Sequence, residues 1–310
     1  DFTKISVFLD IKKLTLFVKF IDPKIKYNNA SLPLKTLRTD INLEPLVRKK
    51  LIIKRAELST EFLDFNKIKK LLKKNDQQIP GFKKIKSANL KIESLELIFD
   101  EDFKFNKDYK VIGKIKNVGI ILSEEYEIKN LSSNFFYKNN NIKLNDTSFN
   151  INNFSKDSKN FYNGELELSQ KDKKYDIDFK FNVKNLSNFF KIPGINYSLP
   201  KNESSLVKAQ ISIIKNIIFK NLLIEDKNNQ FKVKNIKFSK DLNLINFQEI
   251  SIKTSIDNKI NNEFKILNKK NEINIKGQVF DAKNILNELK KNRNKNNFFK
   301  NTNKNIEIDF

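Results

Sequence analysis

The chain contains no cysteine, histidine, methionine or tryptophan among its 310 residues. Without cysteine it forms no disulfide and offers no thiolate as a nucleophile or metal ligand. Without histidine it lacks the imidazole base of a Ser-His-Asp triad and the usual zinc ligand. The remaining Ser, Tyr and Lys residues show no spacing that pairs a nucleophile with a base. The sequence therefore predicts a protein that is not an enzyme and that has neither a cofactor nor a metal site.

Glycine and proline are scarce, with six of each, and no Gly-x-Gly-x-x-Gly or Walker loop is present, which argues against a nucleotide site. No run approaches 18 apolar residues without a charge, so no segment is predicted to span a bilayer. The acidic clusters Glu124-Glu125 and Asp100 to Asp102 fall in expected loops and are interpreted as solvated loop ends. Because the chain begins at Asp1 and not at Met, we expect a mature form or an interior piece of a longer protein.

The net charge is +23, but it accompanies roughly 15% Asn and 28 Phe. Lys, Asn, Ile and Phe are all spelled by A/T-rich codons, so much of this charge reflects codon composition. Lys dominates the basic residues, whereas phosphate and groove recognition favour Arg. We therefore predict no nucleic-acid partner. The charge would instead lie on the polar face of a sheet, where each well-placed Lys favours an anionic membrane surface by ~1 kcal/mol.

Apolar residues alternate with polar ones almost throughout the chain, which is typical of half-buried β-strands. The alternation from Ile5 to Ile11 changes parity after Lys12-Lys13, which indicates a turn or bulge, and a second break falls at Ser94. The clearest hairpin joins the strand around Leu166 to the strand 175–183 through a polar turn at 170–174. Polar, Asn-rich turns every ten to fifteen residues or so predict an antiparallel meander.

Two short helices are expected. One covers 64–73 with Asp64 as its N-cap, and the other follows Asp281 and carries Ile285, Leu286 and Leu289. Residues 290–305 are basic, Asn-rich and of low complexity, which predicts a solvated loop. Residues 306–310 restart the alternation as a further strand, and we expect the fold to continue beyond them.

A mostly-β meander with so few helices must hide its apolar face either by closing into a sandwich or barrel, or by curling into a long trough. A closed core and a trough lined by Ile, Leu and Phe are both compatible with the periodicity. A trough would suit acyl chains, since hydrophobic transfer yields ~0.8 kcal/mol per CH₂ without specific polar contacts. The candidate lining residues are Leu95, Leu97, Phe99, Tyr175, Ile177, Phe179, Phe181 and Val183.

Three N-terminal segments, Lys24 to Tyr27, Thr39 to Leu46 and Leu51 to Leu58, resemble the opening module of AsmA-like proteins, in which a strand ending at a Pro-Leu turn precedes the next strand. The segment Ile275 to Leu286 is similar to a Gly-x-x-x-Asp-Ala segment of the YhdP-type branch. The chain departs from the family in being rich in Asn and Lys and in lacking the N-terminal transmembrane helix.

The resemblance implies an elongated antiparallel meander curled into a taco-like groove or tube that carries phospholipids between the inner and outer membranes. It assigns 1–80 to an AsmA-like N-terminal module and 81–289 to the β groove region. It also implies a periplasmic protein, anchored to the inner membrane by a segment upstream of Asp1. The alternative function is a structural or adhesion-type β-sandwich or solenoid that binds proteins or glycans through its loops.

Overall fold

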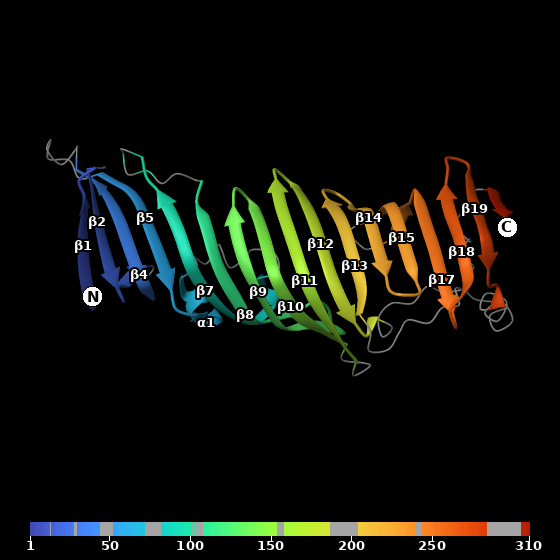
Figure 1. Cartoon of the computed structure of the whole chain (residues 1–310), viewed down its shortest axis with the longest axis horizontal. Coiled ribbons are helices and arrows are strands. Elements are labelled where there is room, and N and C mark those ends of the chain that lie inside the picture. Colours follow the sequence, from blue (N-terminus) through green and yellow to red (C-terminus); the bar gives the residue numbers. More distant parts are fainter. Residues whose placement is uncertain are drawn as a thin grey trace. The chain divides into compact units, whose positions relative to one another are not determined.

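The computed structural model describes the chain except residues 13, 28–29, 44–51, 72–81, 101, 103, 105–107, 154–157, 187–203, 240–242 and 284–304. It divides into two compact units, Asp1–Asp157 and Ser158–Phe310. Strands account for most of the described residues of each unit, where they lie side by side (Figure 1). The expected mostly-β, antiparallel-dominated open sheet is confirmed. The predicted module boundary at residue 80 stays a prediction.

Unit 1 consists of strands in sequential lateral order, with a short helix at the end of one of them. Its elements are β1 (Lys4–Asp10), β2 (Thr15–Ile21), β3 (Lys24–Tyr27), β4 (Ala30–Asn42), β5 (Ile52–Thr60), β6 (Leu63–Asp64), α1 (Phe65–Leu71), a 3₁₀ turn (Phe82–Lys84), β7 (Ile85–Ile98), β8 (Lys110–Ile121), β9 (Tyr126–Lys138) and β10 (Asn141–Asn153). The described antiparallel ladder runs β1, β2, β4, β5, β7, β8, β9, β10, while β3 pairs with β4 and β6 pairs with β7.

Helix α1 forms where the sequence predicts it, because Asp64 Oδ1 accepts a hydrogen bond from the backbone N–H of Lys67 at 2.9 Å. Phe65, at its first position, is buried, and the Lys69 ammonium lies 4.7 Å from the centre of its ring. The predicted helix end at 73 lies outside the described residues. None of the described helices is long and apolar enough to cross a bilayer.

Unit 2 is a second ladder of neighbouring strands. Its elements are β11 (Ser158–Lys171), β12 (Lys174–Lys184), β13 (Ser204–Ile213), β14 (Ile217–Glu225), β15 (Gln230–Phe238), β16 (Leu244–Asn246), β17 (Glu249–Ile256), β18 (Lys259–Asn268), β19 (Glu272–Phe280) and β20 (Asn305–Asp309). The described ladder runs β11, β12, β13, β14, β15, β17, β18, β19, β20, and β16 is a short addition to β15.

Two details of unit 2 differ from the predictions. The turn of the β11–β12 hairpin is shorter than 170–174, because pairing continues to Lys171 opposite Lys174 and Asp172 takes a positive φ of 53°. The strand predicted at 306–310 is present as β20, but it pairs in parallel with β19, Ile273 opposite Ile306. A pure antiparallel meander is therefore wrong at this edge. The predicted helix after Asp281 and the 290–305 loop fall almost entirely outside the described residues.

Asparagine and aspartate occupy many of the turns and bulges of both sheets. The two-residue turns Asn139-Asn140 and Asp257-Asn258 have positive φ at both positions, as type I′ hairpins require. Asn117, Asn130 and Asn235 take positive φ within β8, β9 and β15, a conformation that Asn tolerates better than most residues. Each of the last three lies where the alternation changes parity, so the apolar side chains before and after it stay on one face.

Candidate functional site

The sheet of unit 2 has one continuous apolar face, which we call the unit 2 face. Directly opposed residues of neighbouring strands share a face, so the pairing register defines rows across the sheet. The middle row is apolar on all nine strands of the described ladder: Leu166, Phe179, Ala209, Leu222, Val233, Ile250, Ile266, Ile275 and Ile308. Apart from buried Ala209 and exposed Ile308, these side chains are partly exposed to solvent.

A second row lies two residues away along each strand, and most of its side chains are buried. It runs Gly164, Phe181, Val207, Ile224, Phe231, Ile252, Phe264 and Gly277. Phe181, Phe231, Ile252 and Phe264 are each 4% or 5% exposed. We call this the buried row, and it forms the closed side of the unit 2 face.

Over β11 to β15 the opposite side of the same face is accessible to solvent, whereas Ile273 of β19, which lies on that side of the middle row, is 5% exposed. Here the row consists of Gln170, Tyr175, Ile213, Ile217 and Phe238, and Tyr175 is 40% exposed. Exposure along β12 therefore rises from 0% at Val183 to 40% at Tyr175 although every second residue is apolar. The unit 2 face therefore has a closed side, which is buried, and an open side, which solvent can reach.

Aromatic contacts and the raised pKa of a buried tyrosine support the assignment of the closed side. The Phe181 ring lies 5.7 Å from the ring of Phe179 and 6.4 Å from that of Tyr162, measured between centroids. Burial raises the pKa of the Tyr162 hydroxyl. At the other end of the row, Phe264 packs edge-on against Phe280 with ring centroids 5.4 Å apart. These contacts make the closed side a packed core and not a loose binding surface.

Three glycines lie directly opposite phenylalanines, where a side chain would collide with the neighbouring strand. A Cβ on Gly164 would lie 1.9 Å from the Lys180 carbonyl oxygen, and one on Gly277 would lie 2.5 Å from the Glu263 carbonyl oxygen. The two glycines are the ends of the buried row, and their partners Phe181 and Phe264 are the next residues inward. Gly113 has the same relationship to Phe135 in unit 1. The glycines thus allow the backbones to approach and the phenyl rings to cover them.

Unit 1 has a corresponding apolar face, the unit 1 face. Leu95 and Leu97 of β7 lie opposite Leu58 and Ala56 of β5. The bulge between Ile92 and Ser94 keeps Leu90 and Ile92 on this face, opposite Ile115 and Gly113 of β8, as the predicted break at Ser94 implied. Phe99 follows the end of β7, where its backbone N–H donates to the Lys54 carbonyl at 3.0 Å.

The eight predicted lining residues thus form two sets, one in each unit. Tyr175, Ile177, Phe179, Phe181 and Val183 all lie on the unit 2 face, and Leu95 and Leu97 lie on the unit 1 face, with Phe99 just beyond its strand. The prediction missed several residues of the same faces, among them Phe219, Leu222 and Ile266. A bulge at Lys220 interrupts the alternation of β14, which is why that strand gave no clear signal.

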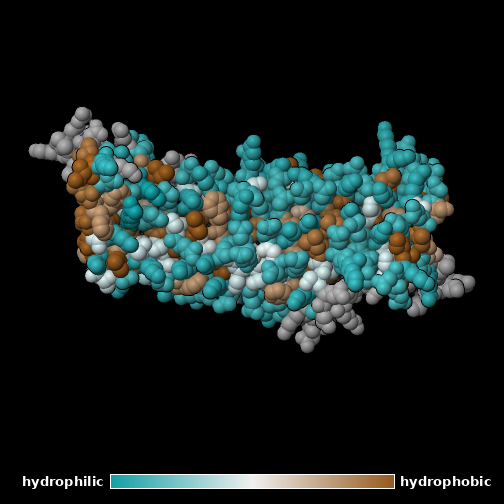
Figure 2. Space-filling view, viewed as in Figure 1, coloured by the Kyte–Doolittle hydropathy of each residue, from teal (hydrophilic) through white to brown (hydrophobic). Residues whose placement is uncertain are grey.

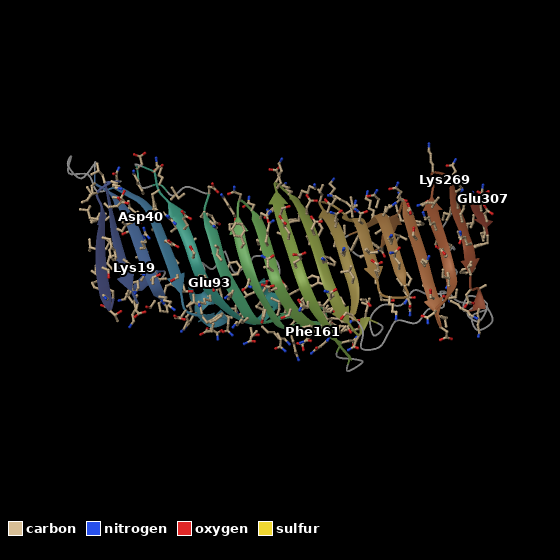
Figure 3. All side chains as sticks on the ribbon, viewed as in Figure 1. Lys19, Asp40, Glu93, Phe161, Lys269 and Glu307 are labelled. Carbon is tan, nitrogen blue, oxygen red and sulfur yellow. The ribbon has the colours of Figure 1, made fainter. Side chains whose placement is uncertain are left out.

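The reverse face of each sheet is mostly polar, because polar residues alternate with those of the apolar face along the strands, and hydrophilic residues predominate on the surface seen in Figure 2. In Figure 3 it carries Lys19 and Asp40 in unit 1 and Glu307 in unit 2. One row of this face in unit 2, which we call the lysine row, carries the exposed lysines Lys180, Lys208, Lys232, Lys265 and Lys276. Leu223 and Ser251 lie between them in the same row, and Glu165 and Asp309 lie at its two ends. Ion pairs are more frequent in the neighbouring rows, such as Lys234–Glu249 at 3.1 Å.

A buried carboxylate is held on the polar face of unit 1. Burial alone would raise the pKa of Glu127, but the ammonium groups of Lys129 and Lys86 outweigh it, so the pKa is lowered. Within the described residues, no group of three or more acidic side chains gathers where it could hold a metal ion. Asp100 instead accepts backbone hydrogen bonds from Asp102 and Lys104 and orders its own loop.

The carboxylate of Asp176 is predicted to make stability depend on pH. The Lys174 ammonium, 2.7 Å from Oδ2, lowers the pKa of Asp176 to about 2, with Lys220 acting in the same direction from 3.1 Å and partial burial acting against both. The unfolded pKa is about 3.9, so the stabilisation is complete above about pH 5 and is lost as pH falls through about 2. We expect Asp176→Asn to cost about 0.5–1 kcal/mol at pH 6 and only a small fraction of that at pH 2 in urea titrations. Asp178→Asn, at an exposed position on the same face, is the control; an equal loss in both variants would contradict the ion-pair explanation.

Comparison with protein-family models, curated proteins and solved structures finds no match to this chain.

Proposed function

We propose that the chain binds phospholipid acyl chains along its apolar faces, as a section of a periplasmic, AsmA-like protein that moves phospholipids between the inner and outer membranes. The observation that carries the proposal is the middle row of the unit 2 face, which is apolar across nine strands and yet partly exposed. Soluble proteins rarely leave so long an apolar path accessible unless something binds there.

The dimensions of the middle row suit a lipid tail. Neighbouring strands lie about 4.8 Å apart, so nine strands give a path of about 38 Å. One leaflet of a bilayer holds its acyl chains within about 15 Å, half of the hydrocarbon core. The path is therefore long enough for more than one acyl chain in succession, and each buried CH₂ contributes about 0.8 kcal/mol. A lipid held in this way can move along the row, because no single polar contact fixes it.

The polar face supports a membrane environment. The lysine row would attract anionic headgroups at ~1 kcal/mol per well-placed Lys. The anchor to the inner membrane belongs to the proposal as a segment upstream of Asp1, in line with the AsmA-like resemblance. The alternative, an adhesion-type protein that binds other proteins or glycans through its loops, gives no role to the accessible middle row.

Site-specific photo-crosslinking tests the proposal within one strand. A photoreactive phenylalanine analogue at Phe179 lies on the middle row, and the same analogue at Lys180 lies on the reverse face one residue away. After incubation with vesicles of zwitterionic phosphatidylcholine, which give the lysine row no net negative charge to bind, and irradiation, we expect an adduct of phospholipid mass at position 179 and none at position 180. Intact-mass spectrometry detects the phospholipid adduct in either variant.

Two further measurements make the outcome decisive. Phospholipid extracted from the purified chain should be detected by mass spectrometry, and Phe219 on the neighbouring row should crosslink as Phe179 does. Equal labelling at 179 and 180, or labelling at neither while circular dichroism shows intact β-structure, would contradict the lipid proposal.

A further inference from the structure

Strand β1 is an edge strand with an unusually apolar composition. Among the described residues β1 pairs only with β2, so no described strand pairs with its other side. Val7, Phe8 and Leu9 are 58%, 60% and 56% exposed. Figure 2 shows the corresponding hydrophobic colour over β1 and β2. Natural sheets usually protect such an edge with charge, proline or a bulge inside the strand, and β1 has none of these at its centre.

The sequence of β1 is complementary to itself in one antiparallel register. When two copies pair about Val7, Val7 lies opposite Val7 and Ile5 lies opposite Leu9, all on the unit 1 face. On the reverse face Phe8 lies opposite Ser6, and Lys4 lies opposite Asp10 at both ends of the pair. Moving the centre to Phe8 would place Lys4 opposite Lys12, and moving it to Ser6 would place Asp10 opposite Phe2. Only the Val7 register joins opposite charges at both ends.

We propose that β1 is the dimerisation edge of this chain, and that a second copy pairs with it antiparallel about Val7. Such a contact is isologous, because the same strand serves both copies and the two-fold axis passes beside Val7. The unit 1 face then continues without interruption from one copy into the other, since directly opposed residues of antiparallel strands share a face. The contact depends on strand pairing and charge alone, so the dimer proposal does not rest on the proposed lipid binding.

A single introduced thiol tests the register, because the chain contains no cysteine. Val7→Cys places the two thiols directly across the two-fold axis, and a short bismaleimide should convert most of the protein to a covalent dimer. Asp172→Cys in the β11–β12 turn is the control, where we expect no more crosslinking than diffusion gives. Equal crosslinking of the two variants would overturn the proposal.

Charge reversal tests whether a second copy of the chain is the partner that pairs with β1. Lys4→Glu alone places Glu opposite Asp10 at both ends, and Asp10→Lys alone places Lys opposite Lys4. Each should weaken dimerisation about ten-fold in analytical ultracentrifugation, whereas the double variant should restore it. Hydrogen exchange of the β1–β2 hairpin reports whether β1 still folds in each variant. A wild-type chain that stays monomeric at high concentration, or a folded double variant that fails to recover, would overturn the proposal.

Discussion

Val183→Asp is expected to unfold much of unit 2, with a loss of about 4 kcal/mol or more in its free energy of unfolding. Val183 is 0% exposed and lies opposite Tyr162 of β11 and Ser205 of β13, and Ser205 is itself 2% exposed. Among the described residues, an aspartate there would lie opposite two uncharged side chains, since Lys184, the next residue, belongs to the reverse face. Hydrogen exchange followed by mass spectrometry should show β11 to β13 losing protection together.

Two substitutions in the same strand provide controls for this result. Lys184→Asp introduces the same side chain one residue away at an exposed position and should change stability by less than about 1 kcal/mol. Tyr175→Asp introduces it on the same face, but at the open side where Tyr175 is 40% exposed, and should leave the fold intact. If the proposed lipid binding holds, Tyr175→Asp should also weaken phospholipid crosslinking at Phe179. A folded Val183→Asp variant with normal protection would contradict the assignment of the closed side.

Gly164→Ala is expected to lower the free energy of unfolding by about 3 kcal/mol. The added methyl would lie 1.9 Å from the Lys180 carbonyl oxygen and 2.8 Å from the Phe181 Cα. Both contacts are with backbone of the paired strand, so relief requires the β11–β12 ladder to separate or shift. The shift would also displace Phe181 from the buried row. Urea titration monitored by circular dichroism measures the loss.

Gly119→Ala is the matched control, because Gly119 also lies in a strand of the sheet. Its added methyl would meet the Ser87 hydroxyl oxygen at 3.0 Å, a side-chain atom that can rotate away at the cost of its hydrogen bond to the Asn117 carbonyl oxygen. We expect a change of less than about 1 kcal/mol, with the lower backbone entropy of unfolded alanine partly offsetting the contact. Similar losses at Gly164 and Gly119 would mean that the effect is one of strand propensity and not of close backbone approach.

These two predictions bear on what the apolar faces can do. If the closed side is rigid, as Val183 and Gly164 imply, then ligand must enter from the side of Tyr175 and reach the middle row there. Lipid binding and fold stability would then depend on different rows of one face. Substitutions on the buried row would reduce both together, whereas those on the open row would reduce binding alone.

Much of the fold follows from local alternation. The parity change at Lys12-Lys13 correctly separates β1 from β2, and the break at Ser94 coincides with a bulge in the pairing of β7 with β8. The five alternating residues of β12 all lie on the unit 2 face, as predicted. Strands β8, β9 and β10 were harder to detect, because Asn117, Asn130 and Asp146 take positive φ inside them and interrupt the period of two.

The abundant asparagine also has a structural role that composition alone did not suggest. Codon bias explains why Asn is frequent, but its positions in bulges and in two-residue turns follow from its tolerance of the left-handed conformation. The parallel pairing of β20 could not be predicted, because a strand of five residues carries no local sign of the direction of its neighbour.

The sequence by itself determined that this protein is built of strands with one apolar and one polar face, because side chains in a strand alternate with a period of two. Only the tertiary structure decided which apolar residues are buried and which stay accessible: Val183 and Tyr175 belong to the same alternation, yet one is 0% and the other 40% exposed. The same holds for the lysine row, whose members are scattered from 180 to 276 in the sequence. The physical reason is register, since hydrogen bonding between strands and the bulges within them fix which distant residues lie opposite one another.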